Sequence, residues 1–137
     1  MLACGSRRSI AVLLAAVLTG LAAGCGGVNW ERDQQTGFRK AVQNGQRALI
    51  EFVSGWDEGA NQMDDKVFSD PDVVRLMQRF VAIRLDAGFN RQLAERYGVQ
   101  QTPAFVVIRP DLTVAGMYQG TMKAEQFRAF LIRNSLY

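Results

Sequence analysis

The segment "ALIEFVSGWDEGANQM" (residues 48–63) changes from a strand pattern to a helix pattern within a few residues. Its first part is apolar and rich in β-branched side chains apart from Glu51, which is typical of a buried strand. The run "SGWDEG" ends that strand, and a helix is expected from Asp57 or Glu58 to about Phe68. The stretch "WDEGANQM" contains no histidine, cysteine, lysine or serine, so the chemistry of this turn is unusual.

Hydrophobic periodicity predicts the other elements. A helix from Phe38 turns Ala41 and Val42 to its inner face and ends at Gly45, a residue type that suits a helix C-terminus. The remaining predictions are strands at 47–53, 80–86, 104–109 and 113–119, and helices that begin at Ser69 or Asp70, at about 90 and at about 121. This order predicts an α/β fold with one central mixed sheet of about four strands and helices on both faces.

Apolar side chains at helical spacing indicate the faces that these helices bury. The expected core-facing residues are Val73, Leu76, Met77 and Phe80, then Leu93, Ala94 and Tyr97, and in the last helix Phe127, Phe130 and Leu131.

Length and charge limit the class of protein. The chain has 137 residues, of which 48% are hydrophobic, and this suffices for one globular domain with an ordinary core. Apart from Arg7 and Arg8 near the N-terminus, 14 basic residues are scattered among 13 acidic ones. The body is therefore nearly neutral, without the basic patch expected of a protein that binds nucleic acid, and no nucleic-acid partner is expected.

The first 24 residues are predicted to be a signal peptide. "MLACGSRRS" is a positive n-region, and "IAVLLAAVLTGLAA" is an apolar run of 14 residues. A transmembrane helix needs about 20 apolar residues, so export is the better interpretation. Residues 21–25, "LAAGC", resemble a bacterial lipoprotein signal, in which Cys25 is acylated, for example with palmitate. A twin-arginine signal at "SRRSI" and plain secretion are the alternatives.

These signals predict three parts: a lipoprotein signal peptide at 1–24, a membrane-proximal linker at 25–35 and a domain at 36–137. Cleavage would remove Cys4 and lipid would block Cys25, so the mature protein would have neither a free thiol nor a disulfide. The protein is expected to be exported and anchored by the lipid on Cys25, facing the periplasm or the cell exterior.

Residues 48–87 and 93–120 together carry a family resemblance. The first contains the Trp that precedes the helix and "VFSDP", and the second contains "YGV" and "TPAF". In this order and spacing they resemble the thioredoxin-like family, particularly exported bacterial members related to the C-terminal domain of the disulfide-interchange reductase. The resemblance covers about residues 36–134 and implies a thioredoxin-like fold.

The resemblance places the family's Trp-Cys-x-x-Cys active site at Trp56, with Asp57 and Ala60 at the two cysteine positions. Thiol–disulfide exchange requires a thiolate, which neither residue supplies. No dithiol redox activity is therefore expected. A carboxylate suits the positive end of a helix, so Asp57 is interpreted mainly as an N-cap.

A metal site or acid–base catalysis at Asp57 and Glu58 is the alternative interpretation. Asp64 and Asp65 add acidity nearby, but the chain contains no histidine and the spacing matches no calcium loop. No metal and no cofactor are expected.

Glu51 occupies the position at which the family places a buried carboxylate. Burial would raise its pKa, so a neutral, hydrogen-bonded core group is one interpretation. A glutamate at the end of the strand that reaches solvent is the other.

The resemblance also implies a cis peptide bond at Thr102–Pro103 and a groove for an extended peptide. The groove residues are expected to be Trp56, Asp57, Glu58, Thr102, Pro103 and Gly120. In the alternative interpretation, Pro103 only fixes a turn and Trp56 packs against the domain.

The function expected from these residues is non-enzymatic binding of extended peptides or envelope proteins. The alternatives are an oxidoreductase-related protein that works with the cysteines of a partner, a different reaction at Asp57 and Glu58, and a structural subunit of an envelope complex.

Overall fold

The computed structural model describes residues 27–135. The predicted signal peptide and Cys25 lie outside this range. The helices and strands are α2 (Gln34–Asn44), β1 (Arg47–Val53), α3 (Glu58–Lys66), α4 (Pro71–Met77), β2 (Phe80–Asp86), α5 (Arg91–Arg96), β3 (Ala104–Ile108), β4 (Val114–Gln119) and α6 (Ala124–Arg133).

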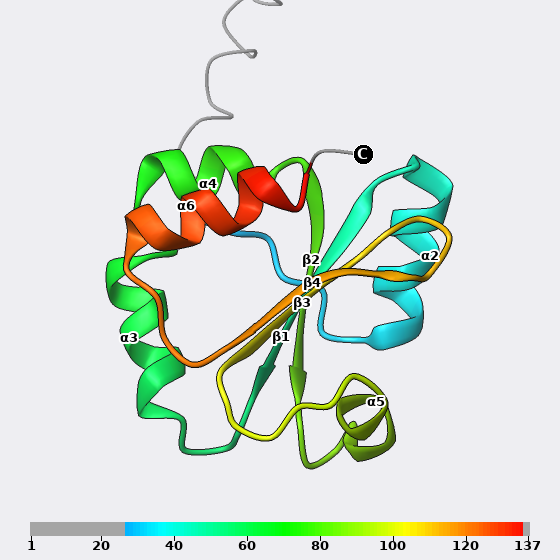
Figure 1. Cartoon of the computed structure of the whole chain (residues 1–137), viewed down its shortest axis with the longest axis horizontal. Helices are drawn as coiled ribbons and strands as arrows, with labels where there is room; N and C mark the ends of the chain where they lie inside the picture. The colour runs from blue at the N-terminus through cyan, green and yellow to red at the C-terminus, as the bar shows by residue number, and fades with distance from the viewer. Residues whose placement is uncertain (1–26, 136–137) are drawn as a thin grey trace, which may run out of the picture.

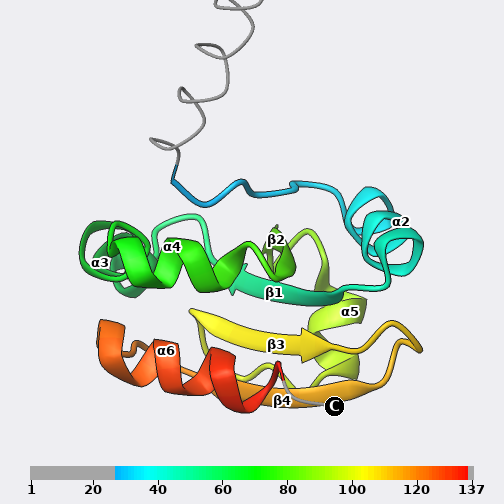
Figure 2. The same cartoon turned by 90° about the horizontal axis from the view of Figure 1, so that it is seen from above.

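The four strands form one mixed sheet in the order β2-β1-β3-β4. β1 runs parallel to β2 and antiparallel to β3, and β3 is antiparallel to β4. Helices α3, α4 and α6 cover one face of the sheet, and α2 and α5 cover the other (Figures 1 and 2). The predicted architecture is therefore confirmed.

The alternation of side chains along β1 divides the core into two layers. Leu49 packs on the side of α3, α4 and α6, where Phe105 and Phe127 also lie. Ile50 and Phe52 pack on the other side, toward α2 and α5. Glu51 follows the same alternation as Leu49, so the fold directs its carboxyl group toward α3.

Local capping explains where several helices begin and end. Asp70 accepts hydrogen bonds from the Asp72 and Val73 amides at the start of α4, and Pro71 follows in the first turn, where its missing N–H costs nothing. Gly45 ends α2 at a φ of 62°, in the left-handed region that glycine adopts easily. The predicted start of α4 at Asp70 and the predicted end of α2 at Gly45 are confirmed.

Two details of the predicted core are wrong. Val42 is half exposed, whereas Ala41 is buried as predicted and faces the sheet together with Gly37. Gly37 lies so close to the Ile83 side chain that a Cβ atom would not fit. Phe80 is buried, but it belongs to β2 and not to the helix before it.

The segment before α2 contacts the domain, although it was expected to be a linker. Glu31 extends the β2 edge through two backbone hydrogen bonds, to the Ala82 carbonyl at 2.8 Å and from the Arg84 amide at 2.9 Å. The Trp30 ring packs edge-on against Phe68, with 5.1 Å between the ring centroids. No helix among residues 27–135 is both long and apolar enough to cross a membrane.

Candidate functional site

Asp57 is the N-cap of α3. Its backbone is extended, and its side chain accepts a hydrogen bond from the Ala60 amide at 2.9 Å and a longer one from the Ser54 amide at 3.4 Å. The Ala60 methyl group is buried behind this turn. The capping interpretation of Asp57 is confirmed, and the carboxylate meets the free amides that a helix N-terminus presents.

The proline loop lies directly against the start of α3. The Thr102–Pro103 peptide bond is cis, as the resemblance implied. A Cβ atom on Gly59 would lie 2.8 Å from Pro103 Cδ and 3.0 Å from Thr121 Cγ2, so only glycine fits there without a shift of neighbouring atoms. The Gly120 amide donates a hydrogen bond of 2.7 Å to the Pro103 carbonyl.

Gln119 of β4 fixes the loop that leads to Thr102. Its side-chain oxygen accepts hydrogen bonds from the Gln100 and Gln101 amides at 2.7 and 3.1 Å, and its side-chain nitrogen donates to the Gly98 carbonyl. No hydrogen bond within residues 27–135 uses the backbone N–H or C=O of Thr102. These two groups are therefore available to pair with another extended chain.

Trp56 is completely exposed on the rim of a cavity. The residue is 101% exposed, so the alternative in which Trp56 packs against the domain is wrong. The cavity, about 470 Å³, runs from Ser54 past Trp56 and Glu58 to Asp64 and Arg84.

The other three predicted groove residues, Thr102, Pro103 and Gly120, do not line this cavity. Pro103 is itself buried, whereas Thr102 and Gly120 are partly exposed. The cavity and the proline loop meet at Ser54, whose hydroxyl lies 3.2 Å from that of Thr102.

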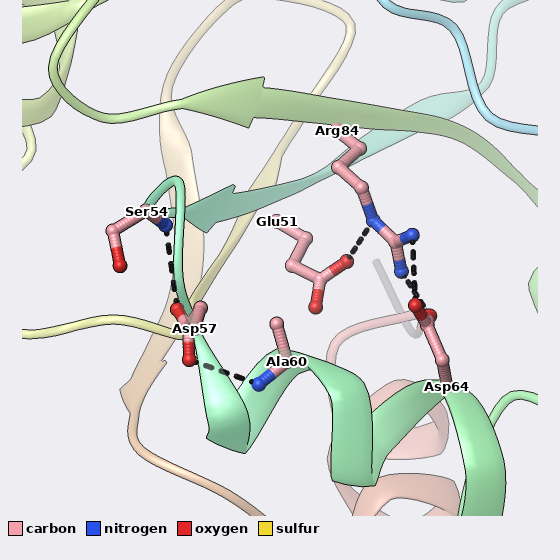
Figure 3. A network of polar contacts seen from close by, with 6 residues as sticks. All are labelled: Glu51, Ser54, Asp57, Ala60, Asp64 and Arg84. Carbon is pink, nitrogen blue, oxygen red and sulfur yellow. Dashed lines mark hydrogen bonds and ion pairs between the residues drawn. The ribbon is translucent and has the colours of Figure 1, made fainter.

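Glu51, Arg84 and Asp64 form an ion-pair network (Figure 3), and two of them, Arg84 and Asp64, also line the cavity. Glu51 is fully buried, and its Oε2 atom accepts a hydrogen bond of 2.6 Å from Arg84 Nε. The guanidinium also pairs with Asp64 of α3 at 2.5 Å. Glu51 Oε1 has no hydrogen-bond partner within the described chain. The network therefore links β1, β2 and α3, with one carboxylate oxygen unsatisfied.

Aromatic rings cover the guanidinium of Arg84. Its central carbon lies 4.4 Å from the centroid of the Trp30 ring and 5.6 Å from that of Phe68. Cation–π contacts of this kind stabilise a partly desolvated charge. Only 12% of the Arg84 side chain remains exposed, so Trp30 contributes to the site from outside the domain boundary expected from the sequence.

Burial raises the pKa of Glu51 from its ordinary 4.5 to about 7. Arg84 opposes this rise in pKa by charge and hydrogen bonding, and the nearby Asp64 and Asp57 add to it. The interpretation of Glu51 as a hydrogen-bonded core group is confirmed, and the one in which it reaches solvent is wrong.

Sequence reasoning missed Arg84, Gln119 and Trp30. Arg84 is the one charged residue inside the otherwise apolar "FVAIRL", and the register of the parallel strands sets it opposite Glu51. Opposite charges in two apolar strands were the available signal for this pair. Within residues 27–135, no group of three or more Asp, Glu, His or Cys side chains is placed to hold a metal ion.

The Glu51→Gln variant tests the buried carboxyl group. Between pH 4.5 and about 7, the folded protein keeps a proton on Glu51 that the unfolded chain has released. The contribution of Glu51 to wild-type stability therefore falls as pH rises through this window. Glutamine mimics the neutral acid, so the variant should gain stability relative to wild type between pH 5 and pH 8, by up to about 3 kcal/mol at roughly 1.4 kcal/mol per pKa unit. Urea unfolding of both proteins at the two pH values measures this, and a difference independent of pH would contradict it.

The Gly59→Ala variant tests the close approach of α3 to the proline loop. The new methyl group would press on the Pro103 ring and should lower the free energy of unfolding by about 1–3 kcal/mol. Gly55→Ala is the matched control, because a Cβ atom there meets nothing within 4 Å, and it should change stability by less than about 0.5 kcal/mol. Equal effects in thermal unfolding would show that the contact is loose.

Comparison with known proteins agrees with this geometry. A family model described as a thioredoxin-like domain matches residues 34–133. The Thiol:disulfide interchange protein DsbD 2 of Pseudomonas aeruginosa is 32% identical over 85 residues, which cover 59% of this chain and 14% of that relative. The match therefore spans only a small part of the relative's length.

Solved structures share the fold. A thioredoxin from Thermus thermophilus is 27% identical with a TM-score of 0.71, over 79% of this chain and 87% of that one. The oxidised C-terminal domain of DsbD from Neisseria meningitidis is 20% identical with a TM-score of 0.66, over 77% and 99% of the two chains. The chain thus belongs to the thioredoxin-like family and is related to its disulfide oxidoreductases.

Proposed function

We propose that this protein binds an extended segment of a partner protein at the cell envelope and does not exchange disulfides. The binding surface runs from the Thr102 backbone across Ser54 to Trp56. The observation that carries the proposal is the backbone N–H and C=O of Thr102, which no group within residues 27–135 pairs, beside a site whose two cysteine positions hold Asp57 and Ala60.

The chemistry of the α3 N-terminus supports the loss of redox activity. Disulfide exchange proceeds by attack of a thiolate on sulfur, and the electron pair for that attack must come from a thiol of this chain or of a partner. The only cysteines in the sequence are Cys4 and Cys25, and both precede the described residues. The field that would stabilise a thiolate in α3 already stabilises the Asp57 carboxylate.

The surface formed by Thr102 and Trp56 favours the binding of a partner segment. Backbone pairing supplies affinity without regard to the guest's sequence, and a neighbouring aromatic side chain supplies buried area. Thr102 offers the backbone groups for pairing, and the fully exposed Trp56 offers the aromatic surface. Gln119 holds the loop in place before the guest arrives, which lowers the entropic cost of binding.

The location proposed is the envelope, with the protein held to the membrane by acylated Cys25. The apolar run before "AAGC" and the small residues around it support export and lipidation. The connector between Cys25 and α2 is short, so the domain would remain close to the membrane, facing the periplasm or the cell exterior. Its partners would then be other envelope proteins.

A second candidate is an oxidoreductase-related role that uses the cysteines of a partner. The relative named as a thiol:disulfide interchange protein favours it. In that case the domain would position a partner's disulfide without supplying the attacking sulfur. A structural subunit of an envelope complex differs from both, since its binding would not depend on Trp56 or Thr102.

Site-specific photo-crosslinking tests the binding surface. A benzoyl-phenylalanine in place of Trp56 should form adducts in intact cells, since this side chain lies on the proposed surface. The same group in place of Ile132, which is 48% exposed on α6, is the control and should form few. Equal adduct patterns at the two positions would point to a structural subunit instead.

Restoring the two cysteines tests the claim that only sulfur is missing. The double variant Asp57→Cys with Ala60→Cys places thiols at the N-cap and one turn into α3, where a thiolate is stabilised. It should reduce insulin in the presence of dithiothreitol faster than the reagent alone, whereas a Cys25→Ser protein with the native site should match the reagent. Turnover by that native site would contradict the proposed loss of activity.

A further inference from the structure

The cavity beside Trp56 carries more negative charge than its protein contacts neutralise. Three carboxylates, Asp57, Glu58 and Asp64, belong to its lining, and within the described chain Arg84 is its one basic residue. Arg84 is already shared between Asp64 and the buried Glu51. Glu58 is exposed and makes no hydrogen bond or ion pair within residues 27–135. A positively charged guest would relieve this excess.

Glu51 provides a second and independent sign of an absent partner. The side chain is fully buried, yet its Oε1 atom has no hydrogen-bond partner in the described chain. Figure 3 shows its carboxyl group between Ala60 and Arg84, two residues of the cavity lining. Burial raises the pKa of Glu51 to about 7, so above this pH the group is a carboxylate that adds negative potential next to the cavity, where solvent screens it little.

The rim of the cavity suits a flat cation. The Trp56 side chain is fully exposed and packs on nothing in the domain. Indole is the best aromatic partner for a guanidinium, which stacks on the ring while its N–H groups reach carboxylates. Since no group of three or more acidic, His or Cys side chains in residues 27–135 is placed to bind a metal ion, a side-chain cation fits better than a metal.

We propose that the cavity between Trp56, Glu58 and Asp64 binds an arginine side chain of the extended segment held by the Thr102 loop. The inference rests on the proposed function and specifies the chemistry of the guest. The cavity begins at Ser54, whose hydroxyl contacts that of Thr102, so one short segment reaches both places. The arginine stacks on Trp56 and pairs with Glu58 at the open end.

Matched peptides test the charge requirement on the full-length protein in mild detergent. A short capped β-branched peptide with one central arginine is compared with its citrulline twin, which keeps the shape and removes the charge. Calorimetry should give about fivefold tighter binding of the arginine peptide at low salt, from one stacked and one paired contact. The preference should shrink at high salt because the site is partly exposed.

Two variants test whether Glu58 causes the preference for the arginine peptide. Glu58→Gln should remove most of the arginine preference, so that the arginine and citrulline peptides bind this variant with similar affinity. Asp65→Asn makes the same charge change at an exposed residue of α3 outside the cavity lining, and it should keep the preference. Trp56 fluorescence reports occupancy, since the only other tryptophan, Trp30, is packed against Phe68.

The outcomes separate the two proposals. Equal binding of the arginine and citrulline peptides, both dependent on Trp56, would overturn the cation site and leave the peptide groove intact. Failure of both peptides to bind would overturn the groove and the cation site together. Loss of the arginine preference in Asp65→Asn as fully as in Glu58→Gln would also overturn the cation site, because the attraction would then be general.

Discussion

The first amides of α3 need an acceptor, and the Asp57 carboxylate supplies it. This contact fixes the turn between β1 and α3, sets Gly59 against Pro103 and leaves Trp56 pointing into solvent. The thioredoxin-like family is expected to use the same position for a cysteine. Here a carboxylate occupies the stabilising field of the helix, so the capping contact forms at a position that holds no sulfur.

Three charged side chains next to this turn form an ion-pair network. Two apolar strands hold Glu51 and Arg84 opposite each other, and Asp64 reaches the same guanidinium from α3. Breaking such a buried pair leaves an uncompensated charge, which is costly even where the intact pair adds little stability. The network therefore ties α3 to the sheet, and the surplus of carboxylates in the cavity lining would attract a cation.

The sequence alone predicts the sheet well and the site only in part. β1 and β2 are long apolar runs between clear breakers, so their bounds at 47–53 and 80–86 agree with the structure. The Asp57 cap involves residues close in sequence, so it could also be predicted. The contact between Glu51 and Arg84 depends on the register of strands far apart in the sequence, which no local pattern determines. Trp30 was assigned to a linker because its partners, Phe68 and Arg84, become neighbours only after folding.

The proposed function requires that the backbone of the proline loop pairs with a guest segment. Amide hydrogen exchange at Thr102, followed by NMR with and without the arginine peptide, tests it most directly. We expect rapid exchange in the free protein, where the Thr102 N–H has no acceptor among the described residues, and clear protection in the complex. Unchanged exchange at Thr102 in a saturated complex would show that the guest binds elsewhere and would contradict the account.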